Sequence, residues 1–304
     1  MRFRSAPRVV VAAAVASVAL VVASLGLGGN AARAVDTSGV VNITTGLAYE
    51  NGYAAGTGMV ITSSGLVLTN NHVIRGATTI RVTFPSAGRS YSASVLGYSV
   101  NGDIALLQLK GASRLKSVRL GNSAQVRVGE AVTAVGNAGG QGTLTSSNGT
   151  VVALNRTITV SDERQATARL SHLIQIDASL EPGDSGGPTL DSSTHVIAIN
   201  TAASASFRFE STNEGYAIPI NRAMAIVAQI RAGKSSATVH VGSTPLLGVS
   251  VAPASSGSGG DAGAYVVSVA TGSPADRAGI EAGSTIVRLD GTTVRSYDQL
   301  ATTL

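Results

Sequence analysis

Short apolar stretches separated by glycine, asparagine and serine dominate this chain from Val40 to about Ile218. Ile80, Val82 and Phe84 alternate with polar residues, and this period of two indicates a half-buried strand. Similar apolar runs occur at 66–68, 104–109, 131–135, 150–154, 173–176 and 195–200. Many short strands with turn residues between them predict an all-β sandwich or a pair of barrels.

A helical pattern follows these strands. Apolar residues recur at helical spacing at Ile220, Met224, Val227 and Ile230. Asn221 is the expected N-cap, and Gly233 stands where the helix should end. We therefore expect a β domain over residues 35–233 that is closed by one C-terminal helix.

A second unit is predicted beyond a small, polar linker at 234–243 (KSSATVHVGS). Over 244–304, strands are expected at 246–251, 265–269 and 285–289, and helices at 273–279 and 296–304. This alternation indicates a small α+β domain.

The first 34 residues have the pattern of a secretory signal peptide. Three arginines lie in 1–8, residues 9–27 carry no charge, and Ala32-Arg33-Ala34 is a small-x-small cleavage signal. We expect cleavage after Ala34 and an extracytoplasmic or secreted mature protein. The alternative is an uncleaved anchor, because about 20 apolar residues suffice to span a membrane.

The positive charge of the chain belongs largely to this leader. The full chain has 22 Lys plus Arg against 17 Asp plus Glu, and four of the arginines precede residue 35. The remainder has a net charge of +1, so nucleic acid is not an expected partner. The chain has no cysteine, which excludes disulfides and Cys-ligated metals.

The strongest chemical signal is GDSGGP at 183–188. A serine between glycines on a tight loop exposes its Oγ, and nearby backbone N–H groups can converge on one point, as a nucleophile beside an oxyanion hole requires. A base and an orienting acid are available in His72, after an apolar strand, and Asp103, before another. The order His72, Asp103, Ser185 is that of the two-barrel serine protease triad.

Four motifs together resemble the HtrA/Deg family of secreted bacterial serine proteases: TNNHV (69–73), GDIALL (102–107), GDSGGP (183–188) and EGYAIP (214–219). The sequence looks closest to the PepA-like exported members, and the resemblance runs from about Val40 to the C-terminus. It implies two six-stranded chymotrypsin-like β-barrels with a C-terminal helix, followed by a PDZ domain.

The resemblance also implies roles for the motif residues. Ser185 would attack the scissile carbonyl, His72 would move its proton, and Asp103 would orient the imidazole. The backbone N–H groups of Gly183 and Ser185 would form the oxyanion hole. One departure is Asp184, where this family usually has Asn; an acid at this position in trypsin-like zymogens pairs with a new N-terminus, here near Val35.

The residue six before the nucleophile, Ser179, is expected at the base of the S1 pocket, and it is not acidic. The expected pocket walls are small or apolar, and they come from Asn200, Thr201, Ala202, Tyr216, Ala217 and Ile218. We therefore expect a small aliphatic residue at the P1 position of substrates. The glycine-rich segment 136–142 (GNAGGQG) lacks the Lys-Ser/Thr ending of a phosphate loop and is predicted to connect barrel strands.

In the PDZ-like unit, Leu246, Leu247, Gly248 and Val249 match the loop that binds a peptide carboxylate. The chain ends at Leu304, inside the expected groove helix, so we expect this PDZ unit to be incomplete, as a fragment or a truncated product.

The sequence thus predicts an exported serine endopeptidase that acts on unfolded or misfolded polypeptides and binds peptide C-termini, without a cofactor or a metal. The alternative is a non-hydrolytic chaperone that binds clients in the PDZ groove. The resemblance also suggests a homotrimer, to which Tyr49 and Tyr53 could contribute. The other histidines (His172, His195 and His240) are expected to be ordinary core or surface residues.

Overall fold

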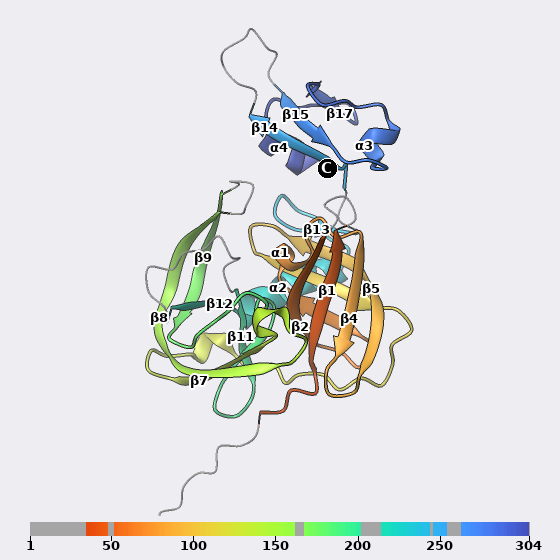
Figure 1. Cartoon of the computed structure of the whole chain (residues 1–304). Coiled ribbons are helices and arrows are strands. Elements are labelled where there is room, and N and C mark those ends of the chain that lie inside the picture. Colours follow the sequence, from red (N-terminus) through yellow and green to blue (C-terminus); the bar gives the residue numbers. More distant parts are fainter. Residues whose placement is uncertain are drawn as a thin grey trace, which may run out of the picture. The chain divides into compact units, whose positions relative to one another are not determined.

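A computed structural model describes residues 35–47, 52–161, 167–201, 214–243, 246–253 and 263–303. The predicted signal peptide, Tyr49 and Ala202 lie outside these residues. Two closed antiparallel β-barrels of six strands each form the first domain (Figure 1). The fold class predicted from the sequence is therefore confirmed.

Barrel 1 has the strand order β5-β4-β1-β2-β3-β6 and closes by pairing of β5 with β6. Its strands are β1 (Val40–Leu47), β2 (Gly52–Val60), β3 (Leu66–Thr69), β4 (Thr79–Phe84), β5 (Arg89–Ser99) and β6 (Ile104–Leu109). The period-two pattern of the sequence places Ile80, Val82 and Phe84 of β4 in the buried core of this barrel. A one-turn helix, α1 (Asn71–Ile74), follows β3 directly.

Barrel 2 has the strand order β10-β11-β12-β9-β8-β7, and β10 pairs with β7 to close it. Its strands are β7 (Ala131–Gly136), β8 (Thr145–Ser161), β9 (Thr167–Ile176), β10 (Pro188–Leu190), β11 (Val196–Asn200) and β12 (Gly215–Pro219). A short 3-10 turn, η1 (Ser123–Gln125), precedes the barrel, and another, η2 (Ala138–Gly140), lies between β7 and β8. The glycine-rich segment 136–142 thus connects two barrel strands, as predicted.

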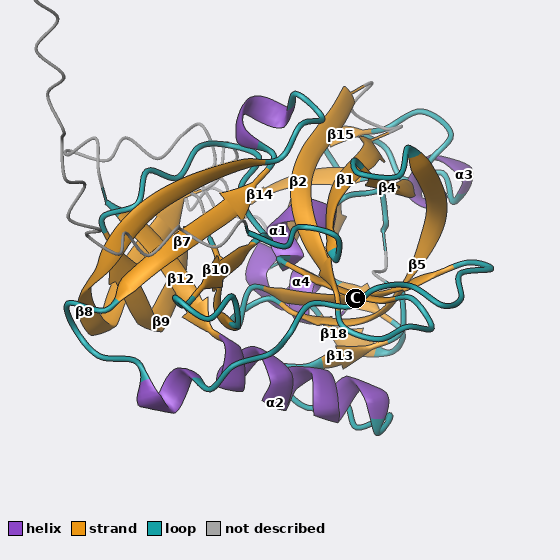
Figure 2. Ribbon diagram, turned by 90° about the horizontal axis from the view of Figure 1, so that it is seen from below, coloured by secondary structure: helices purple, strands orange, loops and turns teal. Residues whose placement is uncertain are grey.

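The helix α2 (Ile220–Arg231) contacts strands of both barrels, namely β5, β6, β11 and β12, and runs along the edge of the two-barrel body in Figure 2. It ends as predicted, with Gly233 at a φ of 67° just beyond it. The prediction that Asn221 is the N-cap is wrong, because the helix begins at Ile220 after Pro219. The Asn221 side chain instead bonds to Asn122 at 2.7 Å and fastens the helix to η1.

The segment predicted as a linker contains a short strand, β13 (His240–Val241), that pairs with Tyr98 and Gly97 of β5. The Tyr98 and His240 rings lie 4.9 Å apart at this pairing. The ordered structure of barrel 1 therefore extends to Val241, and the linker between the two domains is shorter than the predicted 234–243.

The second domain contains the sheet β14-β15-β16, the hairpin β17-β18 and two helices. The bounds are β14 (Val249–Pro253), β15 (Ala264–Val269), α3 (Pro274–Arg277), β16 (Thr285–Ile286), β17 (Arg288–Leu289), β18 (Thr292–Thr293) and α4 (Tyr297–Thr303). The Ser273 hydroxyl caps α3 by accepting the N–H of Asp276 at 3.1 Å. No helix among the described residues has the length and apolar character needed to cross a membrane.

Candidate active site

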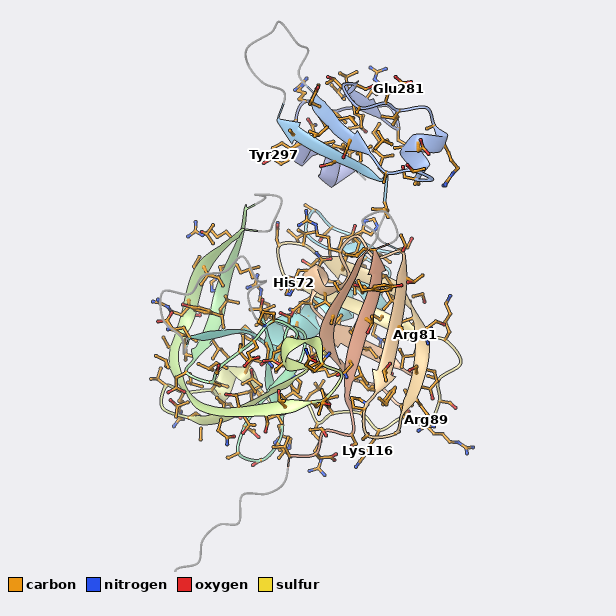
Figure 3. All side chains as sticks on the ribbon, in the orientation of Figure 1. His72, Arg81, Arg89, Lys116, Glu281 and Tyr297 are labelled. Carbon is orange, nitrogen blue, oxygen red and sulfur yellow. The ribbon has the colours of Figure 1, made fainter. Side chains whose placement is uncertain are left out.

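His72 and Asp103 form a close pair on barrel 1. His72 lies on α1, directly after β3, and Asp103 lies directly before β6. The Nδ1 atom of His72 is 2.8 Å from Oδ2 of Asp103, and the backbone N–H of His72 donates to Oδ1 at 3.0 Å. One carboxylate therefore holds both the ring and the backbone of His72, which is labelled in Figure 3.

Asp103 is itself held by its backbone conformation and by hydrogen bonds from Asn70 and Thr201. Its backbone has the left-handed φ of 50°, which few non-glycine residues adopt. The buried side chain of Asn70 donates to its carbonyl oxygen at 2.9 Å. From barrel 2, the hydroxyl of Thr201 donates to Oδ2 at 3.2 Å. The pair is thus completed by a residue from the other barrel, at the junction between them.

This environment fixes the tautomer and basicity of His72. Because a carboxylate only accepts hydrogen bonds, Nδ1 carries the proton and Nε2 keeps a lone pair. Burial lowers the pKa of His72, but the charge and the hydrogen bond of Asp103 outweigh it, so the pKa is raised above 6.5. The His72 side chain is 37% exposed, so the ring can take up a proton and still be reached by a substrate.

The nucleophile loop, named for the predicted nucleophile Ser185, is built on two glycines with left-handed backbone. Gly183 has a φ of 103° and Gly186 a φ of 87°. At Gly186 a Cβ would come within 2.1 Å of the Thr57 carbonyl oxygen, so only glycine allows β2 to approach so closely. The backbone N–H of Thr57 donates to the Ser185 carbonyl oxygen at 2.8 Å, which attaches this loop to barrel 1.

Asp184 is buried beside Ser185, the predicted nucleophile. Its Oδ2 accepts the backbone N–H of Glu181 at 2.9 Å, whereas Oδ1 is buried without a hydrogen-bond partner among the described residues. Burial, and secondarily the charge of Glu181, raises the pKa of Asp184 to about 6 against the hydrogen bond from the Glu181 backbone. The pairing of Asp184 with an N-terminus stays a prediction.

The residues predicted to form the S1 pocket differ in burial. Ser179 is exposed, while the Asn200 side chain is fully buried and bonds to Thr189 and to the Val135 carbonyl. Ala217 packs in the core of barrel 2. The pocket as a whole stays a prediction. No local pattern in the sequence indicates the contact of Thr201 with Asp103.

The remaining histidines take part in other contacts or lie at the surface. Nδ1 of His195 is 3.4 Å from Oδ2 of Asp191, and the ring of His240 packs against the ring of Tyr98. His172 is exposed at a φ of 58°. Within the described ranges, no group of three His, Asp or Glu residues is placed to hold a metal ion.

In the second domain, the predicted carboxylate-binding segment lies next to the start of α3. Gly248 has a φ of 79°, and a Cβ there would come 2.2 Å from Cβ of Ser273. The N–H of Ala275 donates to the Leu247 carbonyl and the N–H of Ala270 to the Gly248 carbonyl, both at 2.9 Å. Gly248 thus permits the close packing that fixes this turn before β14.

Comparison with known families agrees with these two domains. Residues 56–199 match the trypsin-like peptidase domain, and residues 265–304 match the PDZ domain. The first match contains His72, Asp103 and Ser185, and the second begins at β15.

Curated proteins named as serine proteases are similar to most of this chain. The chain is 37% identical over 247 residues to the serine protease Do-like HtrB of Bacillus subtilis. This alignment covers 76% of this chain and 51% of HtrB. It is 33% identical over 262 residues to the serine protease PepD of Mycobacterium tuberculosis, covering 81% and 53%. It is 35% identical over 254 residues to the periplasmic pH-dependent serine endoprotease DegQ of Escherichia coli, and this alignment covers 81% of this chain and 52% of DegQ. The chain spans about half the length of these relatives, and it belongs to the HtrA/Deg family of trypsin-like serine proteases with a PDZ domain.

Proposed function

We propose that this protein is a serine endopeptidase in which Ser185 is the nucleophile, His72 the general base and acid, and Asp103 the orienting acid. The observation that carries the proposal is the His72–Asp103 pair, 2.8 Å between Nδ1 and Oδ2, in a chain whose GDSGGP loop is attached to the same barrel. Asp103 leaves the Nε2 lone pair of His72 available for the Ser185 proton.

The chemistry follows in two stages. His72 Nε2 takes the proton of Ser185 Oγ as Oγ bonds to the scissile carbonyl carbon, and the imidazolium is stabilised by Asp103. The N–H groups of Gly183 and Ser185 receive the developing oxyanion. His72 then gives its proton to the leaving amine, and water releases the acyl group by the same route in reverse.

We further propose that the substrates are unfolded or misfolded polypeptides outside the cytoplasm. The charged and apolar pattern of 1–34 supports export, and the name of DegQ places that relative in the periplasm. The PDZ unit supports recognition of peptide C-termini, with Leu246, Leu247, Gly248 and Val249 as the carboxylate-binding segment.

Casein digestion by the chain without residues 1–34, beside its Ser185→Ala variant, tests the proposal. We expect the wild type to degrade casein and to react with a fluorophosphonate probe, and the variant to do neither. Equal loss of casein with both proteins would refute the nucleophile assignment. If neither protein digests casein but both suppress aggregation of an unfolded client, the non-hydrolytic chaperone function holds instead.

A further inference from the structure

The glycine-rich segment 136–142 contacts the nucleophile loop through its backbone. The N–H of Gly139 donates to the carbonyl oxygen of Pro182 at 2.7 Å. The peptide that joins Pro182 to Gly183 is trans, so its C=O and its N–H point in opposite directions. By fixing the Pro182 carbonyl, Gly139 therefore also fixes the direction of the Gly183 N–H, one of the two proposed oxyanion donors.

Thr57 of β2 joins this segment to the nucleophile loop. Its hydroxyl accepts the backbone N–H of Asn137 at 2.9 Å and lies 2.7 Å from the Gly183 carbonyl oxygen. Because a backbone N–H can only donate, the hydroxyl accepts from Asn137 and directs its one proton to Gly183. With the bond from its N–H to Ser185, Thr57 contacts both residues of the proposed oxyanion hole.

Thr57 and the two residues bonded to its hydroxyl, Asn137 and Gly183, are all buried, so water does not readily replace these bonds. Thr57 is fully buried (0% exposed), and its carbonyl oxygen accepts the hydroxyl of Thr69 at 2.7 Å. A second contact from barrel 1 reaches the same segment, since the Asn42 side chain donates to the Gly142 carbonyl at 2.6 Å. Without the Thr57 hydroxyl, the Gly183 carbonyl and the Asn137 N–H would lose a partner inside the protein.

We propose that Thr57 is a positioning residue for the oxyanion hole, an inference that rests on the proposed function. Its hydroxyl and its N–H hold the backbone around Gly183 and Ser185 so that their N–H groups meet the same oxyanion. Thr57 does not touch the substrate. Its contribution is therefore to the transition state, and it acts through the nucleophile loop.

Thr57→Val removes the hydroxyl at nearly constant size and is the direct test. We expect kcat for a peptide substrate to fall about 100-fold, the value of one oxyanion donor, with KM changed by no more than about threefold. Binding of a peptide boronate, which forms a tetrahedral adduct with Ser185, should weaken by a similar factor. Binding of the matching product peptide should not change, because it needs no oxyanion hole.

Two further variants separate positioning from folding. Thr57→Ser keeps the hydroxyl and should restore kcat to within about threefold of the wild type. Thr45→Val is the matched control, because Thr45 of β1 is also fully buried and its hydroxyl contacts the Ala54 carbonyl at 3.3 Å. It should lower the melting temperature without lowering kcat. If Thr57→Val fails to fold, Thr57→Cys replaces it, since a thiol is a weaker donor of similar shape.

A folded Thr57→Val protein with wild-type kcat would overturn the proposal, as would equal kcat losses in Thr57→Val and Thr45→Val. A change confined to KM would also overturn it. A wild type that hydrolyses no peptide and binds no boronate would refute the proposed function itself, and the role of Thr57 with it.

Discussion

At the scale of single residues, Asp103 acts on His72 through charge as well as through geometry. The Asp103→Asn variant should lower kcat about 10⁴-fold, because an amide can present a donor to Nδ1 and favour the wrong tautomer. The pKa of His72 should also fall, since the charge of Asp103 is what raises it against burial.

An NMR titration of the His72 ring in both proteins measures this shift, with His72→Ala to assign the signal. An unchanged His72 pKa in Asp103→Asn would show that the charge of Asp103 is not the cause.

Asp184 gives a second prediction at this scale, on stability. Its pKa is about 6 in the folded protein against 3.8 for an ordinary Asp, so folding disfavours its ionised form. The stability of the protein is then highest with respect to this group below pH 3.8 and decreases as the pH rises through 6. Asp184→Asn should remove this dependence and stabilise the protein at pH 8 by up to about 3 kcal/mol.

Urea unfolding of wild type and Asp184→Asn at pH 5 and pH 8 measures the difference. Asp177→Asn is the matched control, because hydrogen bonds from the backbone and hydroxyl of Thr150 lower the pKa of Asp177 and its ionised form favours folding. The two substitutions should therefore change stability in opposite directions at pH 8. A destabilised Asp184→Asn would contradict the prediction.

Sequence motifs were sufficient to pair His72 with Asp103, because each residue lies in a recognisable local pattern. They could not predict the contacts of the Thr57 and Thr201 hydroxyls, whose partners lie far along the chain. The Thr57 hydroxyl bonds to a residue 126 positions away, and the Thr201 hydroxyl to one 98 positions away. A threonine in an apolar strand has no local signal for such a contact, which depends on how the two barrels meet.

At the scale of elements, Gly97 is the position where β5, β13 and α2 come together. A Cβ at Gly97 would lie 2.5 Å from the His240 carbonyl oxygen and 2.7 Å from Cγ2 of Ile230. Gly97→Ala must therefore displace β13 or α2, and overpacking of this kind destabilises by about 1–3 kcal/mol.

Thermal unfolding should show a lower melting temperature for Gly97→Ala, and hydrogen exchange should be faster at 240–241. Ser92→Ala on the same strand is the control, because the Ser92 side chain is exposed. Unchanged exchange at 240–241 would mean that β13 does not depend on the absence of a side chain at Gly97.

The same region shows which elements the sequence could predict. Long runs with period two, such as β4, are buried on one face and were recognisable. The strand β13 has only two residues, so no periodicity distinguishes it from the polar segment around it. The start of α2 was misplaced because the Asn221 amide, which suits an N-cap, is used for a contact with Asn122 99 positions away.

At the scale of the whole molecule, the two domains differ in the size of their cores. Barrel 1 contains a cluster of thirteen buried apolar residues and barrel 2 a cluster of ten, and both barrels bury further apolar side chains, such as Leu106 and Leu173. Among its described residues, the second domain buries five apolar side chains: Ala264, Val266, Ala275, Val294 and Leu300. Because stability grows with buried apolar surface, the second domain should unfold first.

Urea unfolding of the full chain should therefore show two transitions. Leu300→Ala should abolish the first transition or shift it to a lower urea concentration, and leave the second unchanged. Removing a buried leucine side chain costs about 2–5 kcal/mol, a large part of the stability of a small domain. Leu107→Ala, in the core of barrel 1, is the matched control and should move only the second transition. A single transition that both substitutions shift equally would show that the two domains fold as one cooperative unit.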